Sequence, residues 1–138
     1  MKMKVVLDEG AIMPTRAHET DAGLDLYANH SVTIRPGIWA MFDTGVHVAI
    51  PEGYVGMVTS KSGLMRSGIT SRGTIDSGYT GSIRVVLFNH GNAPVYIKKG
   101  QKISQLVIMP IITPELELVD SLEETERGSG GFGSTGKF

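Results

Sequence analysis

The fold of this chain is decided by one stretch of thirty residues, Ile83-Arg-Val-Val-Leu-Phe-Asn-His-Gly-Asn-Ala-Pro-Val-Tyr-Ile-Lys-Lys-Gly-Gln-Lys-Ile-Ser-Gln-Leu-Val-Ile-Met-Pro-Ile-Ile112. Three apolar or alternating segments lie within it, at residues 83–89, 95–98 and 102–112. The turn-forming runs His90-Gly-Asn92 and Lys99-Gly100 separate them. Short segments of this kind, bounded by glycine and asparagine, are typical of β-strands. The stretch therefore predicts consecutive strands joined by tight turns.

The same pattern continues toward the N-terminus, where we expect further strands at residues 24–28, 31–35, 46–50 and 54–59. Turn signals again punctuate the chain, including Arg35-Pro-Gly37 and Pro51-Glu-Gly53. No segment keeps a helical period over about 10–12 residues, although residues 64–67 could form one turn. Strands at this spacing predict an all-β fold, either a sandwich or a small barrel.

Beyond Thr113 the pattern changes, because six acidic residues between 115 and 126 form a connector that leads into a glycine-rich tail. Such a segment cannot supply a core of its own. We therefore predict one β-domain over residues 1–113 and a C-terminal arm over residues 114–138. A length of 138 residues fits one domain with a modest core.

Composition excludes several classes of function. The net charge of −1 offers no basic surface for nucleic acid. The absence of cysteine excludes disulfides, zinc-thiolate sites and thiol nucleophiles. No apolar run approaches the roughly 18 residues of a membrane span, and no signal-peptide core follows Met1. We expect a cytoplasmic protein that binds neither nucleic acid nor membranes.

The tail Arg127-Gly-Ser-Gly-Gly-Phe-Gly-Ser-Thr-Gly136 has five glycines in ten positions. Successive N–H groups of such a run can form a concave nest for an anion. Arg127 adds a guanidinium fork suited to phosphate, and Ser134 and Thr135 add hydroxyl donors. With the aromatic face of Phe132, these groups are typical of a lid over a nucleoside phosphate. A disordered Gly/Ser tail is the alternative interpretation.

Three further clusters could complete a nucleotide site. Asp21 and Asp25 stand four residues apart at the entry to a strand, where they could orient magnesium-bound water or could be ordinary turn aspartates. The run Ser60-Lys-Ser-Gly-Leu64 combines a lysine, two hydroxyls and a glycine at a possible helix start, which favours anions. The run Gly73-Thr-Ile-Asp-Ser-Gly-Tyr-Thr-Gly81 predicts a hairpin with one carboxylate at its mouth, unless that aspartate is an ordinary turn residue.

Together with Lys99-Gly-Gln-Lys-Ile-Ser-Gln-Leu106, these segments resemble the five ordered motifs of the homotrimeric dUTPases. The resemblance runs from about residue 13 to residue 138. It implies a distorted jelly-roll β-barrel, a homotrimer, dUTP as the substrate and Mg²⁺ as the cofactor. It also implies shared active sites. Three motifs would come from one subunit, the Asp76 motif from a second and the C-terminal arm from the third.

The resemblance also implies a role for each matching residue. Asp76 would deprotonate the water that attacks the α-phosphorus, giving dUMP and pyrophosphate. Asp25 would hold magnesium through water. The backbone of Thr74–Asp76 would bond the uracil edge, and Tyr79 would lie against the deoxyribose and leave no room for a 2′-hydroxyl. Arg84 is a weaker candidate for contact near the nucleotide.

The other implied contacts are to the phosphates and the base. Ser62 would donate to the oxygen that bridges the α and β phosphates, where charge develops. Arg127 would hold the γ-phosphate, and Phe132 would stack on uracil. The full implied substrate-binding set is Lys61, Ser62, Gly63, Thr74, Ile75, Asp76, Tyr79, Arg84, Gln105, Arg127, Phe132, Gly133, Ser134 and Thr135.

The chain departs from the family pattern at a few positions. Lys61 stands where arginine is usual, and an ammonium cannot reproduce a bidentate fork. Ser82 stands where glutamate is common, and Thr70 where many bacterial members have asparagine. The dCTP deaminases share the barrel and a similar Ile-Asp-x-Gly turn, but they need a glutamate in the strand that follows, where residues 83–89 offer none. Nucleotide-dependent binding of a regulatory protein, as in phage-type members, is a further alternative.

Overall fold

The computed structural model describes residues 1–138 and contains eleven strands and one short helix. In chain order the elements are β1 (Lys4–Leu7), β2 (Gly23–Tyr27), β3 (Val32–Ile34), β4 (Trp39–Asp43), β5 (Val46–Ala49), β6 (Tyr54–Ser60), α1 (Ser62–Met65), β7 (Ile69–Thr70), β8 (Arg72–Ile75), β9 (Arg84–Asn89), β10 (Val95–Ile97) and β11 (Lys102–Pro110). The all-β prediction is confirmed. No helix has the length and apolar character needed to cross a membrane.

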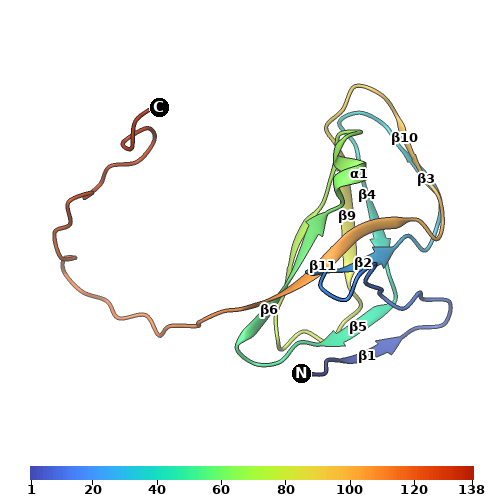
Figure 1. The fold of residues 1–138 in the computed structure, drawn as a ribbon, viewed down its shortest axis with the longest axis horizontal. Coiled ribbons are helices and arrows are strands. Elements are labelled where there is room, and N and C mark those ends of the chain that lie inside the picture. Colours follow the sequence, from blue (N-terminus) through green and yellow to red (C-terminus); the bar gives the residue numbers. More distant parts are fainter.

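The strands form four antiparallel sheets. The largest has the order β2-β11-β6-β8, a second has the order β4-β9-β7, and β1-β5 and β10-β3 are two-stranded ribbons. Nine-residue β11 lies between β2 and β6 and therefore joins distant parts of the sequence (Figure 1). Each sheet is open, so the jelly-roll is built from sheets around one core rather than from a single closed ladder of hydrogen bonds.

One cluster of 16 buried apolar residues forms the core. Strand β9 shows how the sequence builds it, since Val85 and Leu87 are buried while Arg84 and Val86 are exposed, as the period-2 pattern requires. Asn89, at the end of β9, is also buried. Its amide donates to the carbonyl oxygens of Ile34 at 2.8 Å and Ala93 at 2.9 Å. That polar side chain therefore fixes the turn toward β10.

All seven predicted strands are present, with ends that differ by at most two residues. Strands β1, β4 and β7 were not predicted, and β8 was expected only as one side of a hairpin across residues 73–81. In β4 the outward-facing Trp39 and Met41 are apolar, which hides the alternation that a half-buried strand normally shows. The helical turn is α1 at Ser62–Met65, two residues earlier than expected.

The hairpin predicted across residues 73–81 is wrong. Strand β8 pairs with β6, whereas β9 pairs with β4 and β7, so the two strands that flank the turn belong to different sheets. Asp76 instead begins a turn that carries the chain from one sheet to another. Of the glycines that suggested a hairpin, Gly81 leaves room for the Tyr79 ring.

Residues 111–138 contain no strand or helix and lead away from the body of the molecule (Figure 1). The Ile111 N–H donates to the Gly53 carbonyl oxygen at 2.9 Å, and every later hydrogen bond stays within the tail. The boundary between domain and arm at residues 113/114 remains a prediction that this arrangement supports.

Candidate active site

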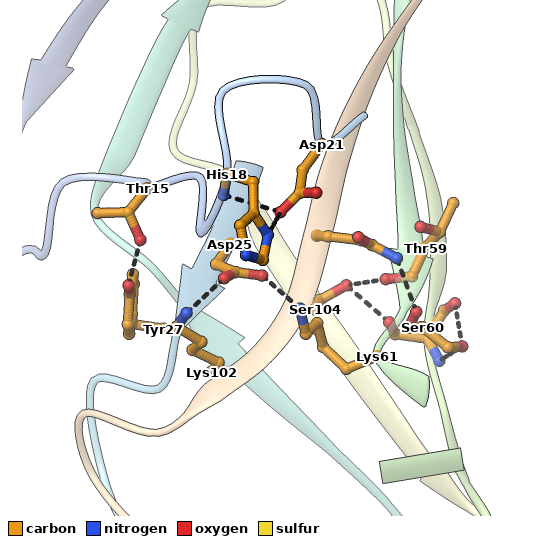
Figure 2. Close-up of polar contacts among 12 residues, drawn as sticks. Thr15, His18, Asp21, Asp25, Tyr27, Thr59, Ser60, Lys61, Lys102 and Ser104 are labelled. Carbon is orange, nitrogen blue, oxygen red and sulfur yellow. Dashed lines mark hydrogen bonds and ion pairs between the residues drawn. The ribbon is translucent and has the colours of Figure 1, made fainter. Parts of the chain in front are cut away.

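Asp25 on β2 is the centre of a charged cluster (Figure 2). Its side chain is 6% exposed, and its two oxygens accept hydrogen bonds from Lys61 Nζ at 2.5 Å and Lys102 Nζ at 2.7 Å. Burial raises the pKa of Asp25, but the hydrogen bonds from Lys102 and Lys61 outweigh it and hold that pKa below its ordinary value. The cluster is therefore one carboxylate between two ammonium groups.

Strand register brings these groups together. On β11, Gln105 lies opposite Asp25 of β2 on one side and opposite Thr59 of β6 on the other, so the end of β6 leads Lys61 to the Asp25 carboxylate. The Gln105 side chain fills the space over Gly23, where an added Cβ would collide with it. Its Nε2 donates to the Ser60 carbonyl oxygen at 3.2 Å.

A serine network links the ends of β6 and β11 next to Lys61 and the first residues of α1, Ser62 and Gly63. The Ser71 and Ser104 hydroxyls are 2.8 Å apart, and Ser104 Oγ donates to the Thr59 carbonyl oxygen at 2.7 Å (Figure 2). Ser60 Oγ accepts from the Ser71 N–H at 2.8 Å. Because buried polar groups that are fully paired rigidify their surroundings, this network gives the exposed Ser62 and Gly63 a firm base.

A second group of predicted residues lines one pocket of about 240 Å³, namely Thr74, Ile75, Asp76, Tyr79 and Arg84. The turn that follows β8 is closed by the Tyr79 N–H, which donates to the Asp76 carbonyl oxygen at 3.0 Å. The Tyr79 hydroxyl donates to the Ser82 carbonyl oxygen at 2.9 Å. This bond folds the phenol over Gly81, where a Cβ would collide with the ring. The pocket thus has a carboxylate and an aromatic wall.

The two groups lie toward opposite ends of β6 within one chain. Ile75, which precedes Asp76, is opposite Gly56, whereas Asp25 shares a row with Gln105 and Thr59. Three residues of strand separate those rows, or about 10 Å at about 3.3 Å per residue. Asp76 makes no hydrogen bond or ion pair with Asp25, Lys61 or Lys102 in this chain.

The arm forms a third group. Arg127, Ser134 and Thr135 line a shared hollow of about 520 Å³ with Thr125 and Glu126. Arg127 Nε donates to the Gly130 carbonyl oxygen at 2.9 Å, which coils the tail around its guanidinium. Phe132 is fully exposed and has no partner in its own chain.

The sequence model of the family described as dUTPase matches residues 9–136. This chain belongs to the dUTPase family. A deoxyuridine 5′-triphosphate nucleotidohydrolase of Clostridium tetani is 43% identical over 141 residues, which cover 99% of this chain and 97% of the relative. The family assigned from the motifs is confirmed.

Solved structures agree with this family. The dUTPase of Staphylococcus bacteriophage 80alpha, solved with dUPNHPP, has a TM-score of 0.92 to this chain at 36% identity over 99% of both chains. A mutant dUTPase from phage phi11 of S. aureus, whose structure describes the coordination of a structural Mg(II) ion, has a TM-score of 0.82 at 34% identity. It covers 90% of this chain and 100% of its own.

Sequence reasoning on this dUTPase-family chain missed two features of the site. Lys102 was quoted within a motif but not recognised as a partner of Asp25. The serine network was also missed, although serines at strand positions where apolar residues are expected are a usable signal. Asp25 itself does not act alone on a ligand, since both of its oxygens already hold lysines.

Asp25 is the single carboxylate of the charged cluster that it forms with Lys61 and Lys102. No three His, Cys, Asp or Glu side chains gather closely enough to hold a metal ion. Mg²⁺ commonly keeps several waters and is bound by one or two carboxylates together with substrate phosphates. The Asp25 carboxylate keeps free lone pairs beside its two lysine bonds. It therefore fits a hydrated Mg²⁺ ion held mainly by substrate phosphates, not an ion coordinated only by protein side chains.

Proposed function

We propose that this chain is a dUTP diphosphatase that cleaves dUTP to dUMP and pyrophosphate in active sites shared between three subunits. Its membership of the dUTPase family supports the reaction. The observation that carries the shared site is the separation of its parts, since the Asp76 pocket and the Asp25 cluster occupy opposite ends of β6. A second copy of the chain would place its Asp76 pocket beside the Asp25 cluster of the first, and a third would supply the arm.

The connector supports the trimer. Leu116, Leu118 and Leu122 are 94%, 100% and 87% exposed, although each would stabilise a protein by about 1.5–3 kcal/mol if fully buried. Leu116 and Leu118 flank Glu117, which is the alternation of a strand with one apolar face. That face has no cover in its own chain, and we propose that a neighbouring subunit covers it.

In the proposed mechanism Asp76 accepts a proton from the attacking water. Its side chain is exposed at the mouth of the pocket, which leaves room for water beside it. The backbone of Thr74–Asp76 would read the uracil edge, and the Tyr79 ring would pack on the deoxyribose. A packed ring at that place rejects a 2′-hydroxyl because the hydroxyl finds neither space nor a partner.

The phosphates would be held by the other groups. Ser62 and Gln105 would donate to them, and Lys61 and Gly63 flank Ser62 in the chain. Arg127 would pair with the γ-phosphate and Phe132 would stack on the base. The neighbouring Gly133, Ser134 and Thr135 would close over the terminal phosphates and exclude water.

Mg²⁺ is the proposed cofactor, and it would neutralise triphosphate charge. Asp25 would accept a hydrogen bond from water on the ion, while Lys61 and Lys102 keep that carboxylate in place. Hydrolysis of a free nucleotide agrees with the cytoplasmic location expected from the sequence.

Pyrophosphate release measured with dUTP, dTTP, dCTP and UTP tests the proposal. Release from dUTP alone, dependent on Mg²⁺, is the expected result. Ammonia release from dCTP would instead support the deaminase alternative.

Regulatory binding is a second candidate function. The phage 80alpha dUTPase, with a TM-score of 0.92 to this chain, is one of the phage dUTPases described as controlling the transfer of virulence genes. A pull-down with and without a non-hydrolysable dUTP analogue would separate nucleotide-dependent partner binding from hydrolysis alone.

A further inference from the structure

His47 on β5 lies between the segment after β1 and the loop that carries Asp76. Its Nδ1 is 2.8 Å from the Thr80 carbonyl oxygen, and its Nε2 is 3.0 Å from Asp8 Oδ1. Thr80 follows Tyr79 directly in the chain, and Tyr79 lines the pocket with Asp76. The imidazole therefore contacts the back of the loop whose front forms the proposed nucleotide pocket.

Both partners of His47 are acceptors. A carbonyl oxygen and a carboxylate can only accept, so both bonds exist together only when both ring nitrogens carry hydrogen. A neutral imidazole donates from one nitrogen and turns a lone pair toward the other acceptor. The hydrogen bonds to Thr80 and Asp8 accordingly raise the pKa of His47 above its ordinary value.

The loop has few other attachments. Within residues 76–82, the bonds from Tyr79 go to Asp76 and Ser82 and so stay inside the loop. Only two hydrogen bonds tie the loop to the body, one from His47 to Thr80 and one from Ser82 Oγ to Asp43. Removing the first leaves the loop held mainly at its two ends.

We propose that His47 is a positioning residue that fixes the Asp76–Ser82 loop and thereby orders the pocket for nucleotide binding. The inference rests on the proposed function, which assigns this pocket to dUTP. His47 touches no substrate; it acts through the Thr80 carbonyl. The protonated ring holds the loop to Asp8, and loss of its proton releases one of the two bonds.

The charges around His47 favour the protonated form. Asp8 bonds to the ring, and Asp43 adds a second negative charge nearby. Lys4 lines the same hollow as His47 and opposes them, while Arg84 lies 3.8 Å from Asp43 and partly neutralises it. The hydrogen bond to the Thr80 carbonyl at 2.8 Å raises the pKa of His47 most, and the bond to Asp8 at 3.0 Å follows it.

The test compares dUTP hydrolysis by the full chain, His47→Gln and His47→Leu from pH 6 to pH 9. At pH 6 the leucine variant should raise KM about three- to tenfold, as expected for loss of one or two hydrogen bonds, with a smaller change in kcat. Glutamine can keep one donor and should rescue part of the loss. Once the native ring is neutral it still keeps one donor, so at the high end of the range the wild-type KM should approach that of the glutamine variant and stay below that of the leucine variant. His90→Gln, which alters a histidine bonded to Thr70, is the matched control and should follow the wild type.

NMR titration gives a readout independent of turnover. The Tyr79 and Thr80 amide signals should follow the His47 titration, and Asp8→Asn should lower the His47 pKa. Two results would overturn the proposal. One is a KM ratio between variant and wild type that is constant across pH, and the other is Tyr79 and Thr80 amide signals that do not shift as His47 titrates. A wild-type chain without dUTP hydrolysis would refute the proposed function instead, and the NMR titration would still decide whether His47 fixes the loop.

Discussion

Replacing Asp25 with asparagine should destabilise the folded chain by about 2–3 kcal/mol at pH 7. The carboxylate is buried and accepts from Lys61 at 2.5 Å and Lys102 at 2.7 Å. Asparagine offers one acceptor oxygen and turns its NH₂ toward the second lysine, so one bond is lost and the other loses its charge. Hydrogen bonds to charged groups contribute about 1.5–3 kcal/mol each. The two lysines are partly exposed and regain hydrogen bonds to water in the variant. The total loss of stability therefore lies near the lower end of what these bonds contribute.

Stability also acquires a pH dependence with a definite sign. Because folding lowers the pKa of Asp25, its stabilisation is fully present above the unfolded value of about 3.8 and is lost as the pH falls through the lower folded value. The difference between wild type and Asp25→Asn should therefore be constant from pH 7 to about pH 5 and shrink below about pH 4.

Urea unfolding followed by circular dichroism at several pH values measures both effects. Protein concentration must be fixed, because subunit association would make stability concentration-dependent. Asp21→Asn is the matched control, since Asp21 belongs to the same motif but its side chain is 43% exposed, and it should change stability far less. Equal stability of Asp25→Asn and wild type at pH 7, or a difference that persists unchanged at pH 3, would refute the reasoning.

Four further predictions concern catalysis. Asp76→Asn should lower kcat by about 10² to 10⁴ because an amide cannot accept the water proton; steady-state kinetics retaining more than about a third of wild-type turnover would remove Asp76 as the base. Tyr79→Ala should narrow the preference for dUTP over UTP in kcat/KM by opening space beside C2′, and an unchanged ratio would place sugar selectivity elsewhere. A chain ending at Glu126 should keep its thermal midpoint but lose several orders of magnitude in activity. Phe132→Ala should be milder, since one base–aromatic stack is worth about 1–3 kcal/mol, and a variant as inactive as the truncated chain would contradict the stacking role.

Local pattern was enough to predict the strands whose two faces differ in polarity, of which β3 is a clear case because exposed Thr33 stands between Val32 and Ile34. It failed at β4, where exposed Trp39 and Met41 make both faces apolar. It also failed at β7, which has only two residues. A hairpin was expected after β8 because turn residues reveal a turn but not which sheet the next strand joins.

The candidate site also has parts that the sequence predicts and parts that it does not. Asp76 and Tyr79 are close in sequence, so the pocket they line could be anticipated from their motif. The pairing of Asp25 with Lys61 and Lys102 depends on the register of β11 between β2 and β6, which no local pattern encodes. His47 bonds to residues 33 and 39 positions away, and its role could be found only in the fold.

The central claim, that Asp76 of one chain works with the arm of another, is tested most directly by mixing two inactive proteins. One is the chain ending at Glu126, which keeps Asp76, and the other is full-length Asp76→Asn, which keeps the arm. After subunit exchange, some sites would combine an intact Asp76 with an intact arm. Pyrophosphate release from dUTP should then rise well above the sum of the separate preparations. No recovery, with exchange confirmed by mass spectrometry, would show that each arm serves the Asp76 of its own chain.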